Sequence, residues 1–234
     1  GLRFDDYSRD ADDASLDDVD ETFVSPRIGV SFRPNDNWQI FGNLARAYRA
    51  PTLTELYNDG VHFAAPGFTL GPGQTFSGVN VFIPNPDLEP EESTQVELGF
   101  RYRNTAVFND SDSLTFSGNL YYAEVDNFID SVVTFIDFST GTPGPGGVVF
   151  NGSTTSRNVD AELYGLEAEV EYDAGLWYTS AGLTIPRGEI SGSGDPLGSI
   201  PQDRLSWTVG YRPHQDWNVG ARLTLTADQD DVPA

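Results

Sequence analysis

Hydrophobic and polar residues alternate along most of the chain. In one segment Val96, Leu98, Phe100 and Tyr102 alternate with Gln95, Glu97, Gly99 and Arg101. The same period of two runs through 27–33, 38–48, 114–124, 164–172, 176–185, 204–212 and 217–225. No segment shows a convincing helical period. A period of two indicates strands with one apolar face, so the pattern predicts an all-β, antiparallel fold of about nine strands.

A soluble β-sandwich alternates in the same way, and three details favour a membrane barrel instead. Several segments have the roughly 9–11 residues that a tilted strand needs to cross a bilayer. The connections alternate between tight turns (34–37, 173–175 and 213–216) and long links (6–22, 50–93, 138–158 and 187–202). Outer-membrane barrels show this asymmetry. Aromatic residues flank the tight turns, where an interfacial girdle would lie, as with Phe32 and Trp38.

About nine strands, with a polar face too charged for a dry core, predict one part of a larger plugged barrel. We therefore interpret residues 1–234 as a partial C-terminal β-barrel domain, with any plug domain outside this sequence. The long connection 50–93 is predicted to be a strand-free loop outside the membrane.

Charge and composition narrow the function further. The chain has 36 acidic and 13 basic residues, a net charge of -23, which argues against nucleic-acid binding and against docking on anionic lipid by charge. Without cysteine it has no disulfide, zinc-thiolate site or cysteine nucleophile. No Ser-His-Asp set or phosphate-binding glycine loop is indicated, so we expect a protein that is not an enzyme and has no catalytic cofactor.

The connection 50–93 contains most of the candidate chemistry. His62 is one of only two histidines, and a neutral imidazole can bind iron, including haem iron. Tyr57 is a secondary candidate, because phenolate also binds haem iron. Phe63 and Phe68 offer apolar surface to a flat ligand, although such rings equally suit packing of the loop onto itself. The other histidine, His214, lies in a tight turn and is expected to be solvated at the opposite rim.

Two short motifs bracket this connection and carry a family resemblance. Tyr48-Arg49-Ala50-Pro51, continuing to Tyr57, and Asn85-Pro86-Asp87-Leu88 resemble segments of TonB-dependent outer-membrane receptors. The segment 56–63, Leu-Tyr-Asn-Asp-Gly-Val-His-Phe, resembles the haem and haemoglobin receptor branch of that family. Asp126-Asn127-Phe128-Ile129 and Tyr164-Gly165-Leu166-Glu167 extend the resemblance along the chain.

The resemblance implies a receptor in the outer membrane of a Gram-negative bacterium, surrounded by lipid, that imports haem with energy from TonB. It implies that His62 is an axial ligand of the haem iron and that a second histidine lies on the plug. The implied partners are haem or a haem-carrying protein, and the TonB complex through a segment outside this sequence. Arg49 and the prolines of the two motifs are expected to be structural.

Two alternatives remain open at this stage. The first is a TonB-dependent receptor for a ferric siderophore or cobalamin, which shares every feature except the role of His62. The second is a secreted glycan-binding β-domain. The acidic cluster at 5–21 lacks the ordered ligand spacing of a calcium loop, so a solvated acidic loop is predicted there.

Overall fold

The computed structural model describes residues 1–9, 19–71, 74–137, 141–144 and 147–229. In these residues one sheet contains β1 (Leu2–Arg9), β2 (Val19–Phe32), β3 (Trp38–Arg49), β4 (Gly60–Gly71), β5 (Gln74–Phe82), β6 (Glu91–Thr105), β7 (Ser113–Thr134), β8 (Thr142–Gly144), β9 (Gly147–Asp173), β10 (Trp177–Ile190), β11 (Arg204–His214) and β12 (Trp217–Thr226). One helix, α1 (Leu53–Tyr57), precedes β4. Among the described residues, no helix is long and apolar enough to cross a membrane.

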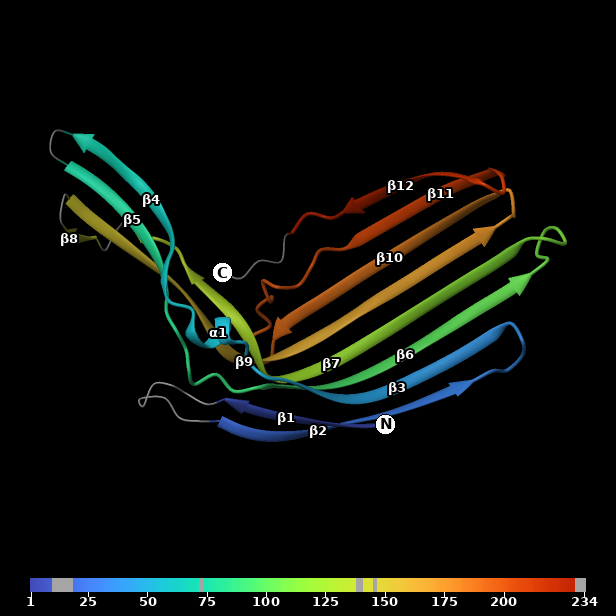
Figure 1. Ribbon diagram of the computed structural model, residues 1–234, viewed down its shortest axis with the longest axis horizontal. Helices are drawn as coiled ribbons and strands as arrows, with labels where there is room; N and C mark the ends of the chain where they lie inside the picture. Colours follow the sequence, from blue (N-terminus) through green and yellow to red (C-terminus); the bar gives the residue numbers. More distant parts are fainter. Residues whose placement is uncertain (10–18, 72–73, 138–140, 145–146, 230–234) are drawn as a thin grey trace.

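Nine of the described strands form a continuous antiparallel sheet in the order β1-β2-β3-β6-β7-β9-β10-β11-β12, which confirms the predicted all-β partial barrel (Figure 1). We call this sheet the wall, and count in it residues 113–126 of β7 and 161–173 of β9. Cross-strand partners point to the same side of a sheet. The register Ile28↔Leu44↔Val96↔Tyr122 therefore gathers the apolar positions on one face, where Ile28 is 65% exposed.

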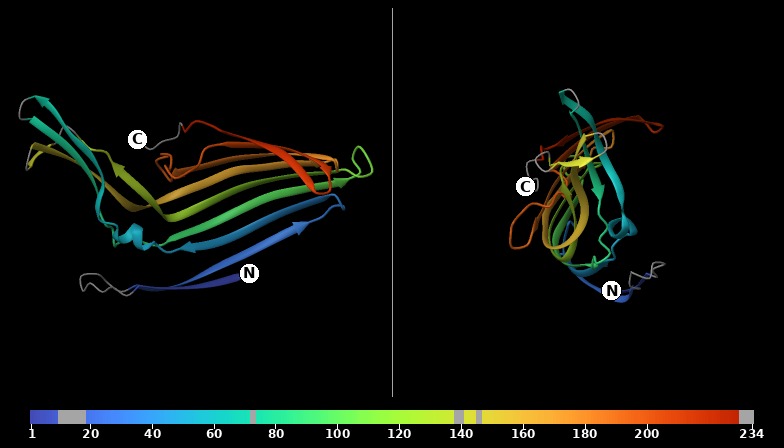
Figure 2. Two further views of the ribbon diagram at one scale, coloured as in Figure 1. Left: turned by 45° about the horizontal axis from the view of Figure 1, so that its top comes forward. Right: turned by 90° about the vertical axis from the view of Figure 1, so that its left-hand side faces the viewer.

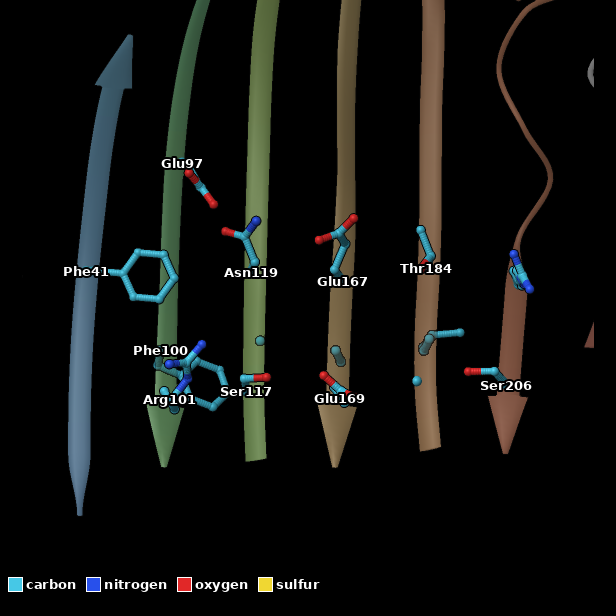
Figure 3. A pocket seen from close by; sticks show the side chains of 15 residues that line it. Phe41, Glu97, Phe100, Arg101, Ser117, Asn119, Glu167, Glu169, Thr184 and Ser206 are labelled. Carbon is cyan, nitrogen blue, oxygen red and sulfur yellow. The ribbon is translucent and has the colours of Figure 1, made fainter. Parts of the chain in front are cut away.

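The opposite face of the wall is polar and hollowed. Figure 3 shows one row of side chains formed by Asn119, Glu167 and Thr184, from β7, β9 and β10, with Glu97 of β6 beside it. A neighbouring row contains Arg101, Ser117, Glu169 and Ser206. Together these rows line a hollow of about 460 Å³. A wall that is apolar on one face and charged on the other is typical of a wide barrel around a polar interior.

The tight turns of the wall lie at one end of the molecule, as predicted (Figure 1). The turn between β6 and β7 is organised by Asp112, a buried carboxylate that accepts hydrogen bonds from the backbone amides of Val107, Phe108 and Asn109 and from the Tyr172 hydroxyl. Burial raises the pKa of the Asp112 carboxyl, but these hydrogen bonds outweigh burial and hold the pKa below its ordinary value.

The prediction of a strand-free loop at 50–93 is wrong. Residues 60–71 and 74–82 form the paired strands β4 and β5, and β5 pairs in parallel with the start of β9, from Phe76↔Val148 to Phe82↔Thr154. Prolines, glycines and three register shifts break the period of two in this hairpin. Its pairing partner lies about 70 residues further along the chain, so local sequence does not reveal the strands.

Two other predicted links also contain strand. β7 and β9 have 22 and 27 residues, so much of the predicted 138–158 link extends the sheet beyond the wall. In the predicted acidic loop, Asp5 and Asp6 belong to β1, and Asp20 and Glu21 belong to β2. Residues 10–18 lie outside the described residues. In the parts of the chain that the structure describes, no group of three or more acidic or histidine side chains is placed to hold a metal ion.

We call the sheet beyond the wall the arm: β4, β5, β8, residues 128–134 of β7 and residues 147–159 of β9. The views in Figures 1 and 2 show it bending away from the wall at the end opposite to the tight turns. The bend begins at a register shift between Val125 and Phe128, where Asn127 has a φ of 57°. Asparagine tolerates this left-handed conformation better than most residues. One bulged residue therefore separates the wall from the arm.

Candidate functional site

The first motif forms an ionic clamp at the base of the arm. The Arg49 guanidinium donates through Nε and Nη2 to the two carboxylate oxygens of Glu91, both at 2.6 Å, and through Nη1 to Glu55 at 3.0 Å. These hydrogen bonds raise the pKa of Arg49, and those to Glu91 have the largest effect. Burial raises the pKa of Glu55. The hydrogen bonds from Arg49 and Thr52 outweigh burial, so the pKa of Glu55 lies below its ordinary value.

Helix α1 is held by an N-terminal cap and by one buried side chain. Thr52 and Glu55 form a reciprocal capping box, in which the Thr52 amide donates to Glu55 at 2.7 Å. Leu56 is fully buried in a small cluster with Leu88 of the second motif and Ile129 of β7. Tyr57 packs against that cluster. A five-residue helix carries no periodicity, but Thr52-x-x-Glu55 is the signal that would have predicted it.

The second motif fastens the chain to β9. The Asn85 side chain donates to the Ser156 carbonyl at 2.9 Å, and the Asn85 amide donates to the Leu56 carbonyl at 2.9 Å. The amide of Asp87 donates back to Asn85 Oδ1 at 3.3 Å. The remaining motif residues are also placed for packing: Tyr48 stacks on Phe23, Pro51 is buried, and Ala50 and Pro86 are half-buried. The two motifs therefore join α1 to β7 and β9 at the base of the arm.

His62 lies on the arm at a β-bulge. The pairing of β4 with β5 shifts between Val61↔Val81 and Phe63↔Asn80, so His62 and Phe63 both oppose Asn80. Bulges of this kind turn a side chain toward a site. Here the bulge brings the His62 Nδ1 to 3.0 Å from the Thr154 hydroxyl and 3.3 Å from Asn80 Oδ1. No hydrogen bond to His62 Nε2 occurs within the described residues.

The groups beneath His62 are buried and fully engaged. Asn80 is 0% exposed and Thr154 is 7% exposed. The Thr154 hydroxyl donates to Asn80 Oδ1 at 2.8 Å, and Asn80 Nδ2 donates to the Thr134 carbonyl at 3.0 Å. The backbone around Thr134 crosses directly over Gly152, where a Cβ would lie 2.9 Å from the Ile136 nitrogen. Glycine at position 152 is therefore required for this close approach.

Aromatic rings flank His62 on the arm. Its ring centroid lies 4.4 Å from that of Phe82 and 5.2 Å from that of Phe63, which is 39% exposed. Phe82 and Thr154 also line a pocket of about 220 Å³ between α1 and the arm. The backbone of Phe68 belongs to β4, but its side chain lies outside the described residues. Tyr57 does not join this group and packs into the cluster below α1.

His214 is the last residue of β11, beside the tight turn to β12 and at the opposite end of the molecule from the arm, as predicted (Figure 1). It is largely exposed, and its Nδ1 lies 3.2 Å from an Asp216 carboxylate oxygen. Asn80 and Thr154 were not predicted as site residues. They lie 18 and 92 positions from His62, and the parallel pairing of β5 with β9 brings them together. A local motif does not encode such a contact.

The wall, with tight turns at one end and the arm at the other, is typical of an outer-membrane β-barrel protein. A family model described as "TonB dependent receptor-like, beta-barrel" matches residues 1–234. The chain therefore belongs to the TonB-dependent receptor β-barrel family, whose members lie in the outer membrane of Gram-negative bacteria. This assignment replaces the alternative of a secreted glycan-binding domain.

A hemin receptor of Yersinia pestis is 32% identical over 210 residues, which cover 89% of this chain and 28% of that protein. The chain thus spans less than a third of that relative. Among solved structures, the copper transporter OprC has a TM-score of 0.64 at 24% identity, covering 93% of this chain and 28% of OprC. The Serratia marcescens hemophore receptor HasR, solved with its hemophore HasA and heme, has a TM-score of 0.62 at 20% identity, covering 97% and 39%. Both structural similarities concern the fold alone.

Proposed function

We propose that this chain is part of a TonB-dependent receptor that takes up haem, with His62 as an axial ligand of the haem iron. One observation carries the proposal. At the end of the molecule remote from the tight turns, an exposed imidazole is held through one ring nitrogen while the other is free of hydrogen bonds within the described residues. A neutral imidazole nitrogen is a suitable ligand for haem iron.

The surroundings of His62 suit a flat, largely apolar ligand. The rings of Phe63 and Phe82 contact the imidazole, and Phe63 is partly exposed beside it. Aromatic rings provide contact area and stack favourably on a planar macrocycle. The similarity to a hemin receptor supports the same ligand class. Phe68 remains a candidate for contact with haem, and Tyr57 remains a secondary candidate for iron ligation.

In this proposal the wall is the scaffold and the arm captures the ligand. The apolar face of the wall meets the lipid of the outer membrane, and the polar face surrounds the path of the ligand. The tight turns then face the periplasm, and the arm projects outside the cell. A haem-carrying protein would deliver its haem at the arm. Release inward would require the TonB complex, acting through a part of the receptor beyond these residues.

A receptor for another ligand is the main rival, because it would share the same wall. Haem titration of the detergent-solubilised full-length receptor, followed by the Soret band, separates the two. We expect the His62→Ala variant to bind haem about a hundredfold more weakly, a loss of roughly 3 kcal/mol. The matched control His214→Ala should bind haem like the wild type. Equal affinity and equal spectra for wild type and His62→Ala would contradict the proposal and would favour a siderophore, cobalamin or copper ligand, each of which can be titrated in its own right.

A further inference from the structure

The orientation of the Asn80 side chain follows from one backbone carbonyl. The Thr134 carbonyl oxygen lies 3.0 Å from the Asn80 amide and can only accept a hydrogen bond. The Asn80 NH₂ group must therefore face Thr134. This places Asn80 Oδ1 on the other side, toward Thr154 and His62, where it can only accept.

The protonation of the His62 ring follows from Asn80. The Thr154 hydroxyl uses its single hydrogen to donate to Asn80 Oδ1 at 2.8 Å. It therefore presents only lone pairs to the His62 Nδ1, 3.0 Å away. Both groups that the described residues place within reach of Nδ1 are thus acceptors, so Nδ1 carries the proton. In a neutral imidazole, Nε2 then holds the free lone pair.

We propose that Asn80 and Thr154 are positioning residues that hold His62 as the Nδ1–H tautomer and direct its Nε2 lone pair at the haem iron. The inference rests on the proposed function for the identity of the ligand, but the tautomer itself does not depend on haem. Metal-binding histidines commonly donate their second ring N–H to an oxygen, which fixes the ring and raises its basicity as a ligand.

The burial of the pair makes this arrangement rigid before haem arrives. Asn80 is 0% exposed and Thr154 is 7% exposed, so breaking either hydrogen bond would leave a buried polar group unsatisfied. Such a loss costs about 1–3 kcal/mol. The Thr134 carbonyl is fixed in turn by the chain crossing over Gly152. A site set in advance loses less free energy to ordering when the ligand binds.

The first test reads the tautomer in the haem-free receptor. The full-length protein is labelled with ¹⁵N-histidine, and His62 is assigned by the signals that His62→Gln removes. We expect Nδ1 of His62 to be protonated and Nε2 to be unprotonated at a pH where the ring is neutral. A protonated Nε2, or two tautomers in similar amounts, would overturn the inference whether or not the protein binds haem.

The second test uses a matched pair of variants. Thr154→Val removes the hydroxyl at nearly constant volume, and Thr154→Ser keeps it. We expect Thr154→Val to populate both tautomers and to weaken haem binding about tenfold, within the range typical of such partners of metal ligands. Thr154→Ser should keep the wild-type tautomer and affinity. An unchanged tautomer in Thr154→Val, or equal losses in both variants, would show that the hydroxyl does not position the ring. If His62→Ala binds haem normally while the tautomer is as expected, the proposed function fails and the positioning stands.

Discussion

The wall and the arm differ in how their strands pair, although they share β7 and β9. In the wall, each strand pairs antiparallel with the next wall strand along the chain, and the period of two sets which side chains face each side. In the arm, β5 pairs in parallel with β9, and the hairpin contains three register shifts. Regular alternation thus builds the scaffold, and departures from it build the candidate site.

The largest expected effect comes from filling the space at Gly152. A Cβ there meets backbone atoms of residues 134–136, which cannot move aside cheaply. We expect Gly152→Val to destabilise the arm by about 1–3 kcal/mol, as overpacking typically does, and to abolish measurable haem binding by displacing Asn80. The wall should still fold, as shown by unchanged strand content in circular dichroism and by retained outer-membrane insertion.

Gly42→Ala is the matched control in the wall, because a Cβ there would lie 3.6 Å from the nearest atom, the Glu97 carbonyl oxygen. It should leave both insertion and haem binding unchanged. If Gly152→Val binds haem as the wild type does, the crossing over Gly152 is not what holds the site together.

A smaller effect is expected from the clamp at Arg49. Replacing Arg49 with Ala leaves Glu91 and Glu55 close together without their shared cation. Charge-assisted hydrogen bonds contribute more than neutral ones, but the partial exposure of Arg49 reduces the effect, so we expect a loss of about 1–2 kcal/mol in arm stability. Faster proteolysis within residues 50–90, measured on intact cells, would report this loss.

Arg46 offers the comparison for this variant. Like Arg49 it lies on β3, and it pairs with Glu92 of β6, but its side chain is 54% exposed and has one carboxylate partner among the described residues. Arg46→Ala should therefore change proteolysis little. Similar cleavage rates in the two variants would mean that the clamp has no special role in fixing the arm.

The smallest expected effect is a pH dependence of the same clamp. The folded-state pKa of Glu55 lies below its ordinary value of 4.5. Its contribution to stability is therefore fully present above that ordinary value and is lost as pH falls through the lower folded value. Hydrogen exchange of the α1 amides should be protected equally at pH 7 and pH 6, after correction for intrinsic rates, and should lose protection only below about pH 4.5. Glu55→Gln should remove part of this dependence, and an opening of α1 that begins near pH 6 would contradict the assignment.

The strands of the wall can be predicted from the sequence, but most of the arm cannot. Alternation at residues such as Val96, Leu98 and Phe100 is sufficient to predict strands, because the apolar face of each strand is visible in its own sequence. The position of His62 between the two motifs marked it as a candidate. Its partners Asn80 and Thr154 meet only through the parallel pairing of β5 with β9, and the bulge at His62 has no sequence signature. Long-range contacts of this kind require the folded structure.

Replacing the proposed iron-binding residue at position 62 tests most directly whether the arm binds haem iron through His62. Ferric haem bound to the full-length receptor is examined by electron paramagnetic resonance in the wild type, His62→Tyr and the control Tyr57→Phe. A phenolate ligand changes the electronic structure of the iron. We expect His62→Tyr to replace the wild-type signal with that of a tyrosinate-ligated haem, while Tyr57→Phe leaves the signal unchanged. A wild-type signal in His62→Tyr, or its loss in Tyr57→Phe, would contradict the account.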